Sequence, residues 1–215
     1  MYLHPLTASL PAAERASFAR LCRLSHFKRN QTVLEAGAST DQLYCVATGL
    51  LRVVTPECGD RPEVTSEFIR PDGFFDLPVR EDRYRAEQSL VAVLPSSVYL
   101  VPVMAMRELC ARHPEVAMAL LGLVVSRMGM LSGQMRRVST LPSEERVHRV
   151  LHQLTQLAPV REGGYDKRIS QSMIASYSGL SREVVNKTMR DMEQRGLLRR
   201  DAHAVHVMHT FARAA

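Results

Sequence analysis

The stretch GLSREVVNKTMRDME, residues 179–193, decides what the C-terminal third of this chain can be. On a helix, positions i, i+1, i+4 and i+5 share one face, which brings four polar residues together: Arg182, Glu183, Asn186 and Lys187. A second face collects residues at the spacing of a packed helix surface: Val185, Thr188, Met189 and Met192. The stretch therefore predicts a helix that is packed on one side and presents a polar edge on the other.

The residues around this stretch predict the rest of a small domain. Ser170 and Ser181 each stand as the N-cap of a helix, and Gly179 lies in the short turn between the two helices. Gly196 closes the second helix. The expected elements are helices at 141–158, 170–176 and 181–195, a loop at 159–167 and a two-stranded hairpin at 197–208. Helix, turn, helix and hairpin together predict a winged helix-turn-helix.

Composition and charge agree with a nucleic-acid partner. The chain has 215 residues and a net charge of +6. Residues 143–215 hold 12 Lys/Arg and 8 Asp/Glu, whereas residues 1–142 hold 16 and 14, so the excess is concentrated in the final third. No run of about 18 consecutive apolar residues occurs, and no basic start precedes an apolar run, so we expect a cytoplasmic protein without a membrane partner.

The first half of the chain is predicted to form a β domain. A helix is expected at 11–26, and short β-rich runs with turn residues between them follow. The expected strands are Thr32–Leu34, Leu43–Val46, Leu50–Val54, Glu63–Ile69, Ala86–Val93 and Ser97–Val101. Many short strands at regular spacing predict a small antiparallel barrel or sandwich.

Two helices are expected after the β domain, a short one at 104–113 and a long one at 114–139. Within the long helix, apolar residues recur at alternating spacings of four and three, as in a coiled coil: Ala117, Leu121, Val124, Met128, Leu131, Met135 and Val138. A neighbouring face carries Val116, Leu120 and Leu123. A helix that is apolar on two faces predicts packing on its own domain on one side and homodimerisation on the other.

The residues of both halves resemble one family. ISQSMIASYSGLSREVVNKTMRDMEQRGLL, residues 169–198, is similar to the DNA-binding segment of the cyclic-AMP receptor/FNR (CRP/FNR) family of bacterial transcription regulators, which typically shows G-x-S-R-E-T-V here. The family's barrel signature is matched by Val33, Gly37, Leu43, Tyr44, Val46 and Gly49. Arg112–Glu115 before the long helix, and Leu141 and Glu145–Arg146 after it, also fit. The resemblance covers about residues 20–208.

The resemblance implies an α+β fold. It comprises an N-terminal cyclic-nucleotide-binding-type β-barrel (jelly roll) at 1–113, a long dimerisation helix and hinge at 114–141, and a C-terminal winged helix-turn-helix at 142–215. The implied partners are double-stranded DNA, a second copy of the chain and RNA polymerase. The implied DNA-binding residues are Ser170, Gln171, Ser181, Arg182, Glu183, Asn186, Lys187 and Arg190.

The resemblance also assigns roles along the polar edge. Arg182, Glu183 and Lys187 occupy the family's base-reading positions, and Lys187 stands where arginine is common. Because lysine is a point donor, its contact is less selective or goes to a phosphate. Two such helices on a dimer would enter successive major grooves about 34 Å apart, which implies a near-palindromic operator.

The effector region departs from the cyclic-AMP pattern. The corresponding residues are Phe74, Phe75, Asp76, Leu77, Arg85, Ala86, Glu87, Leu131 and Ser132. Phe75 and Asp76 replace Gly-Glu, and Ala86 and Glu87 replace the phosphate-binding Arg and hydroxyl, although a shifted loop would let Arg85 restore the charge. We therefore expect neither cyclic AMP nor cyclic GMP as the effector, whose identity stays open.

The sequence gives less support to an iron–sulfur cluster, a haem, a metal site or an enzyme than to a DNA-binding regulator. Cys22, Cys45, Cys58 and Cys110 lie far apart, which excludes an FNR-type iron–sulfur cluster and predicts reduced thiols. Haem stays an alternative through His4, His26 or His113, none of which is marked as an axial ligand. The spacing of His203, His206 and His209 on strands makes a poor metal triad. No catalytic motif is visible, so an enzyme is not expected, and the hairpin domain argues against a pure nucleotide-binding module.

Overall fold

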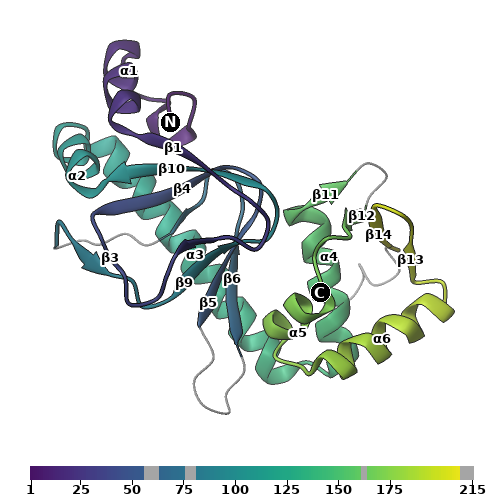
Figure 1. The fold of residues 1–215 in the computed structure, drawn as a ribbon. Helices are drawn as coiled ribbons and strands as arrows, with labels where there is room; N and C mark the ends of the chain where they lie inside the picture. The colour runs from purple at the N-terminus through teal and green to yellow at the C-terminus, as the bar shows by residue number, and fades with distance from the viewer. Residues whose placement is uncertain (56–62, 76–80, 161–163, 209–215) are drawn as a thin grey trace. The chain divides into compact units, whose positions relative to one another are not determined.

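The computed structural model describes residues 1–55, 63–75, 81–160 and 164–208. The chain forms two compact units (Figure 1). The first takes Met1–Pro56 and Glu67–Ser132, and the second takes Gly133–Ala215 together with Glu57–Ser66. The boundary falls inside the longest helix, so this one helix belongs to both units. The predicted α+β fold, with a β domain, a long helix and a helix-turn-helix, is confirmed.

The first unit is built on short antiparallel strands. They are β1 (Arg23–Phe27), β2 (Thr32–Leu34), β3 (Ser39–Thr40), β4 (Gln42–Thr48), β5 (Leu51–Thr55), β6 (Val64–Ile69), β7 (Phe74–Phe75), β8 (Tyr84–Arg85), β9 (Ser89–Ala92) and β10 (Ser96–Pro102). The first residues of β6, up to Ser66, are grouped with the second unit. They pair in the orders β1-β10-β4-β7, β2-β9-β5-β6 and β3-β8. Each of the six expected strands is present. The unforeseen β3, β7 and β8 have two residues each, which is too short for a period-two pattern.

The N-terminal helix is shorter than predicted. After the 3-10 turn η1 (Pro5–Thr7), α1 spans Ala12–Leu21, and the chain becomes extended at Cys22. Residues 23–26, which the sequence placed in the helix, belong instead to β1, which pairs with β10 from Arg23 opposite Leu100 to Phe27 opposite Ser96. The expectation for 22–26 was wrong because strand pairing with a distant segment overrides local helix preference.

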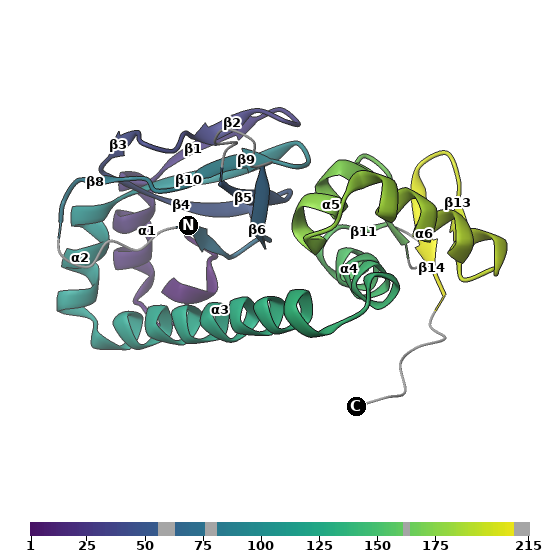
Figure 2. The ribbon, with the colours of Figure 1, turned by 90° about the horizontal axis from the view of Figure 1, so that it is seen from below.

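Side chains from both faces of β4 and β7 fill the interior of the first unit. Successive strand residues point to opposite faces, so Phe74 joins one buried cluster with Cys45, and Phe75 joins the other with Tyr44. The first cluster also receives Leu6 from the N-terminal segment. Figure 2 shows this segment beside the long helix, so the N-terminus is part of the packed unit.

Two consecutive helices complete the first unit. Helix α2 spans Val103–Arg112 and α3 spans Pro114–Thr140, close to the predicted ranges. Val116 is fully buried and Leu120 packs against the same cluster, as expected for the face that contacts its own domain. Leu123, expected on that face as well, is 38% exposed.

The second unit combines three helices with a small sheet. Its elements are α4 (Ser143–Leu157), β11 (Pro159–Val160), β12 (Gly164–Asp166), α5 (Gln171–Ser178), α6 (Arg182–Gln194), β13 (Leu198–Arg200) and β14 (Ala204–Val207). The sheet order is β11-β12-β14-β13. The predicted hairpin is confirmed, but the predicted loop at 159–167 was wrong because parts of it extend the sheet. Gly164 permits this pairing, since an added Cβ would lie 2.7 Å from the Val205 carbonyl oxygen.

Gly49 lies in a tightly packed turn between β4 and β5. It has a φ of +91°, and an added Cβ would lie 2.5 Å from the Pro95 carbonyl oxygen and 2.7 Å from Ser96 Cα. Gly49→Ala is expected to lower the free energy of unfolding by roughly 2–3 kcal/mol, because it combines backbone strain with a clash. Urea denaturation followed by far-ultraviolet circular dichroism measures this.

The matched control is Gly122→Ala in α3, where an added Cβ meets nothing within 4 Å. Alanine there should raise the free energy of unfolding by up to about 1 kcal/mol, the difference in helix propensity. Equal stability of the two variants would contradict the packing assigned to Gly49.

Candidate nucleic-acid interface

Helix α6 is amphipathic in the way that its spacing predicts. Val185, Met189 and Met192 are buried in the second unit, and Thr188 is half-buried beside them. On the opposite edge, Arg182, Glu183, Lys187 and Arg190 are exposed. Within the described part of the chain, none of these four side chains has a recorded hydrogen bond or ion pair. The edge therefore presents three cations and one carboxylate that are free to contact another molecule.

The two serines cap the helices as predicted. Ser170 Oγ accepts from the Met173 amide at 3.3 Å, and Ser181 Oγ accepts from the Val184 amide at 3.2 Å. Each cap satisfies one of the amides that a helix N-terminus leaves without an intrahelical partner. The N-terminal end of α6 keeps its positive helix-dipole potential next to Arg182, which favours contact with a phosphate.

Two predicted DNA-binding residues contact each other. Gln171 Nε2, at the start of α5, donates to Asn186 Oδ1 on α6 across 3.4 Å, a long hydrogen bond. Asn186 is half-buried, so it is less free than its neighbours on the polar edge. The sequence did not indicate this contact, because the two residues belong to different helices.

The C-terminus of α5 is held by side chains from two other helices. Gln134 Nε2 on α3 donates to the Tyr177 carbonyl at 2.6 Å, and an Arg146 guanidinium nitrogen on α4 donates to the Ser178 carbonyl at 3.3 Å. The same Arg146 nitrogen reaches the Val138 carbonyl at 3.3 Å. Gly179, with a φ of +66°, ends α5 so close to Val138 that an added Cβ would lie 3.1 Å from its side chain. These contacts fix the turn of the helix-turn-helix.

Asp201 organises the turn of the C-terminal hairpin. Its Oδ1 accepts from the amides of His203 and Ala204, both at 2.7 Å, and its Oδ2 lies 2.6 Å from His206 Nε2. The His206 hydrogen bond is the main cause that holds the pKa of Asp201 well below its usual range. His206 is buried, so its imidazole serves the packing of the hairpin. Among the described residues, which exclude His209, no cluster of His, Cys, Asp and Glu suits a metal ion.

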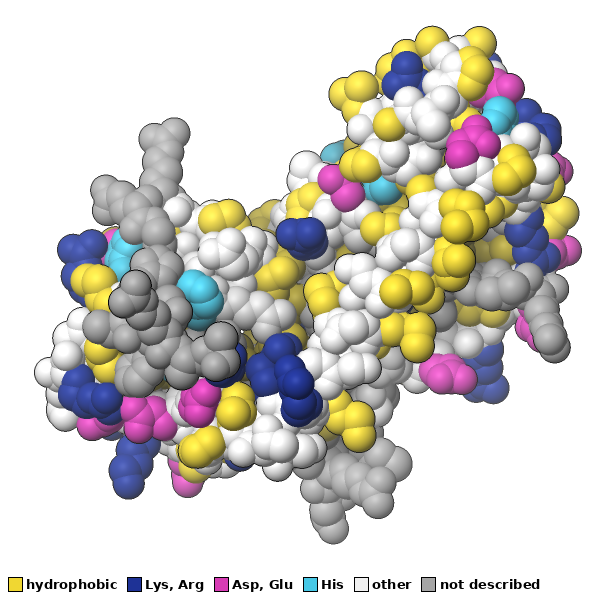
Figure 3. Space-filling view, turned by 180° about the vertical axis from the view of Figure 1, so that it is seen from behind, with side chains coloured by type: hydrophobic (Ala, Val, Ile, Leu, Met, Phe, Trp, Pro, Cys, Tyr) yellow, Lys and Arg dark blue, Asp and Glu magenta, His cyan; other side chains and the backbone are white. Residues whose placement is uncertain are grey.

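The predicted seam of α3 is open to solvent along most of its length. Figure 3 shows hydrophobic side chains gathered over this helix. The exposed or half-exposed members of the seam are Ala117, Leu121, Val124, Met128, Leu131, Met135 and Val138. By length and composition alone, α3 is also apolar enough to cross a membrane, a weak indication for a single helix.

The described residues of the predicted effector pocket differ in burial and in their contacts. Phe74 and Phe75 belong to different buried clusters, and Ala86 is buried with Phe75. Arg85 Nε donates to the Gly37 carbonyl at 2.9 Å, and Glu87 is exposed. Leu131 and Ser132 are exposed on α3, and Asp76 and Leu77 lie outside the described residues.

An ion pair that the sequence did not indicate lies beside Phe75. Arg127 Nε on α3 donates to Glu67 Oε2 on β6 at 2.8 Å, and the Arg127 guanidinium carbon lies 5.9 Å from the centre of the Phe75 ring. Burial raises the pKa of Glu67, and the charge and hydrogen bond of Arg127 oppose this. The pair ties the middle of α3 to the β domain.

The candidate haem ligands and thiols are already engaged or buried. His4 contacts Asp72 and the Leu6 amide, His26 contacts Ser97, and His113 lies between Glu14 and Glu115. Burial raises the pKa of the thiols of Cys22, to about 11, and of Cys45 and Cys110. These three cysteines are therefore protonated at neutral pH, which gives a redox role no support.

Comparisons with known proteins match both units. A family model described as a Crp-like helix-turn-helix domain matches residues 145–210, and a cyclic nucleotide-binding domain matches residues 24–113. A CRP-like cAMP-activated global transcriptional regulator of Mycobacterium tuberculosis is 26% identical over 182 residues, which are 83% of this chain and 81% of the relative.

Solved structures share the fold. FixK2 from Bradyrhizobium japonicum has a TM-score of 0.77 at 18% identity, covering 88% of this chain and 93% of that one. CLP from Xanthomonas campestris, described as a c-di-GMP responsive global regulator, has a TM-score of 0.73 at 20% identity, covering 93% and 100%. The Mycobacterium tuberculosis relative is named as a transcriptional regulator, and the family model that matches the second unit is described as Crp-like.

The contribution of Arg146 to the stability of the helix-turn-helix can be measured. Arg146→Ala leaves the Ser178 and Val138 carbonyls without this donor and is expected to lower the free energy of unfolding by about 1–3 kcal/mol. Arg149→Ala on the same helix removes only an exposed pair with Glu145 and should change it by less than about 1 kcal/mol. Urea denaturation measures both, and equal losses would contradict the anchoring role of Arg146.

Proposed function

Because the chain belongs to the CRP/FNR family of bacterial transcription regulators, we propose that it acts in the cytoplasm as a homodimer on a near-palindromic operator. In this proposal, residues 1–113 form the sensor domain, 114–141 the dimerisation helix and hinge, and 142–215 the DNA-binding domain. The observation that carries it is the edge of α6, where charged side chains without recorded partners lie opposite a buried face.

The exposed edge supplies groups suited to base and phosphate contacts. Arg182 can donate two parallel hydrogen bonds to guanine O6 and N7, and Glu183 can accept from cytosine N4. Lys187 and Arg190 supply further donors, for a base or a phosphate. Asn186 and Gln171, which contact each other, would act together by holding one amide in place for the other.

The open seam of α3 supports the homodimer. Met128 is 63% exposed and Met135 is 75% exposed, although both are large apolar side chains on one face. Arg127 lies in the middle of the same helix and pairs with Glu67, so the helix is also held by charge to its own domain. A second α3 would cover the seam with knobs-into-holes packing and would place two reading helices in successive grooves.

The sensor domain would take an effector other than cyclic AMP. The Mycobacterium tuberculosis relative is described as cAMP-activated, which favours the alternative of a cyclic-nucleotide switch in this chain. Here the guanidinium of Arg85 is bonded to the Gly37 carbonyl, and the carboxylate of Glu87 is the next exposed group along the chain. A carboxylate repels a cyclic phosphate, so we favour a different ligand. A haem sensor stays a further alternative, and RNA polymerase is the proposed protein partner.

Selection from random DNA tests sequence-specific binding. The protein is expected to enrich a near-palindromic site, and Arg182→Ala and Glu183→Ala should each relax the preference at one position of the half-site by roughly 1–3 kcal/mol. Lys187→Arg is the matched gain-of-selectivity variant, because a planar fork replaces a point donor. If no palindromic site is enriched with or without cell extract, the proposal fails.

Sedimentation tests the dimer. Met128→Glu places a charge in the middle of the seam and is expected to give monomers, because a buried unpaired carboxylate opposes association. Met104→Glu, a change at an exposed methionine on α2 outside the seam, is the control and should leave the dimer intact. A stable dimer of the Met128→Glu variant would show that the subunits associate through another surface.

A further inference from the structure

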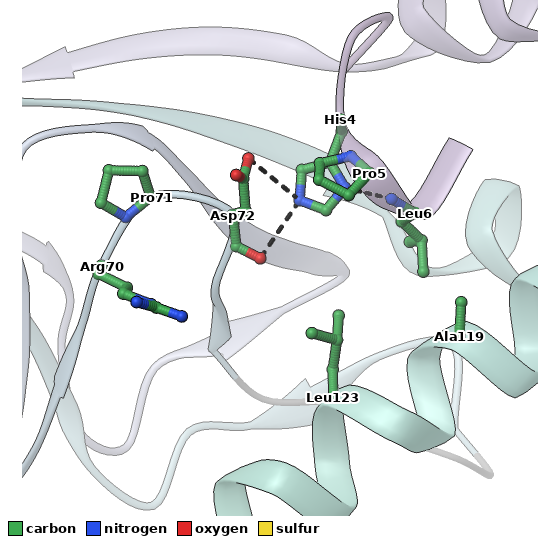
Figure 4. Close-up of a pocket in the computed structure, with 8 residues that line it drawn as sticks. All are labelled: His4, Pro5, Leu6, Arg70, Pro71, Asp72, Ala119 and Leu123. Carbon is green, nitrogen blue, oxygen red and sulfur yellow. Dashed lines mark hydrogen bonds and ion pairs between the residues drawn. The ribbon is translucent and has the colours of Figure 1, made fainter. Parts of the chain in front are cut away.

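The first unit contains a cavity of about 600 Å³ whose lining includes none of the residues of the predicted effector pocket, although His4 of the lining packs edge-on against Phe74. Three segments line it (Figure 4): His4, Pro5 and Leu6 of the N-terminal segment, Arg70, Pro71 and Asp72 of the turn after β6, and Ala119 and Leu123 of α3. Its volume falls within the range of roughly 300–1,000 Å³ that is typical of small-molecule sites. The cavity is therefore large enough for a ligand that contacts all three segments.

His4 forms a fixed, uncharged part of the wall. Only 4% of its side chain is exposed. Its Nδ1 accepts from the Leu6 amide at 3.0 Å, so Nε2 carries the proton and donates to the Asp72 carbonyl oxygen at 3.3 Å. Burial lowers the pKa of His4, and nearby Asp72 opposes this only in part. With both nitrogens occupied, the neutral imidazole holds the N-terminal segment against the turn and does not serve as a cation.

Arg70 and Asp72 supply the charges at the cavity. The Arg70 guanidinium points into the cavity and has no recorded side-chain partner among the described residues (Figure 4). The Asp72 side chain is 58% exposed. Its carboxylate can therefore accept a further hydrogen bond. A planar guanidinium binds a carboxylate through two parallel hydrogen bonds, so the cavity offers one anion-binding and one donor-binding group.

The rest of the lining is apolar. Leu6 and Pro5 form one side, and Ala119 and Leu123 form the other, on one face of α3. Leu123 is 38% exposed although its helix packs on this unit, so its side chain is available to cover an apolar group. The lining thus matches a molecule with a polar end and an apolar body.

We propose that this cavity binds an amphipathic carboxylic acid with a hydrogen-bond donor next to the carboxylate, as in 2-hydroxy and 2-amino acids with an apolar side chain. Arg70 binds the carboxylate, Asp72 accepts from the hydroxyl or ammonium group, and Leu6, Ala119 and Leu123 contact the apolar body. Because binding is measured without DNA, its outcome is independent of the proposed operator binding.

A set of naphthyl compounds separates these contacts. The probes are 2-hydroxy-3-(2-naphthyl)propanoate, 2-amino-3-(2-naphthyl)propanoate, 3-(2-naphthyl)propanoate and the amide of the hydroxy acid. The chain has no tryptophan, so naphthyl fluorescence polarisation can be followed directly. The hydroxy or the amino acid is expected to bind about tenfold more tightly than the amide, the effect of one charge-assisted pair. The tighter of the two identifies the donor.

Two variants test the assigned roles. Arg70→Ala should weaken binding of the acids about tenfold and bring them close to the amide. Asp72→Gly should remove the preference for the hydroxy or amino acid over 3-(2-naphthyl)propanoate. Glycine keeps the left-handed backbone of residue 72, where φ is +66°, without strain. Arg20→Ala on α1, an exposed arginine outside the cavity, is the control and should leave all affinities unchanged.

The same measurements can overturn the proposal. Equal binding of acid and amide, or equal binding to the wild type and Arg70→Ala, would mean that the probes associate with exposed apolar surface instead of this cavity. The proposal is also overturned if none of the four probes binds at millimolar concentration.

Discussion

The carbonyl groups that end α5 have no partners within their own helix, and the arrangement of the second unit depends on how they are satisfied. Gln134 from α3 and Arg146 from α4 donate to the carbonyls of Tyr177 and Ser178, and Gly179 lets the chain turn against Val138. A side chain at position 179 would meet both strain and contact. The turn between α5 and α6 is therefore held against the C-terminal end of α3 by these few contacts.

Helix α3 meets two opposing physical demands. One side carries Arg127, whose pair with Glu67 offsets the desolvation of a nearly buried carboxylate and fastens the helix to the β domain. The seam leaves large apolar residues such as Met128 and Met135 exposed, and this exposed apolar surface is stabilised when a partner covers it. A helix that is fixed on one side and exposes apolar residues on the other is suited to the proposed dimerisation.

Much of the fold could be predicted from the sequence because its signals are local. The alternation of strand residues, the caps at Ser170 and Ser181, and Gly179 in the turn all act within a few residues. The strand at Arg23–Phe27 could not be predicted, because its only strong reason to be extended is its pairing with β10, about seventy residues further along the chain. The contact between Gln171 and Asn186, and the anchoring by Arg146, likewise join residues that no spacing rule relates.

The sequence by itself determined the class of the molecule. Periodicities of two and of three to four residues follow from backbone geometry, and they specify a β domain, a long helix with an apolar seam and a second helix with one buried and one polar side. Only the tertiary structure decided which polar groups are free. Arg85 is used by the Gly37 carbonyl and Arg127 by Glu67, whereas Arg70 points into a cavity. These guanidinium groups are identical in the sequence, and their availability depends on which distant acceptors the folded chain brings within hydrogen-bond distance.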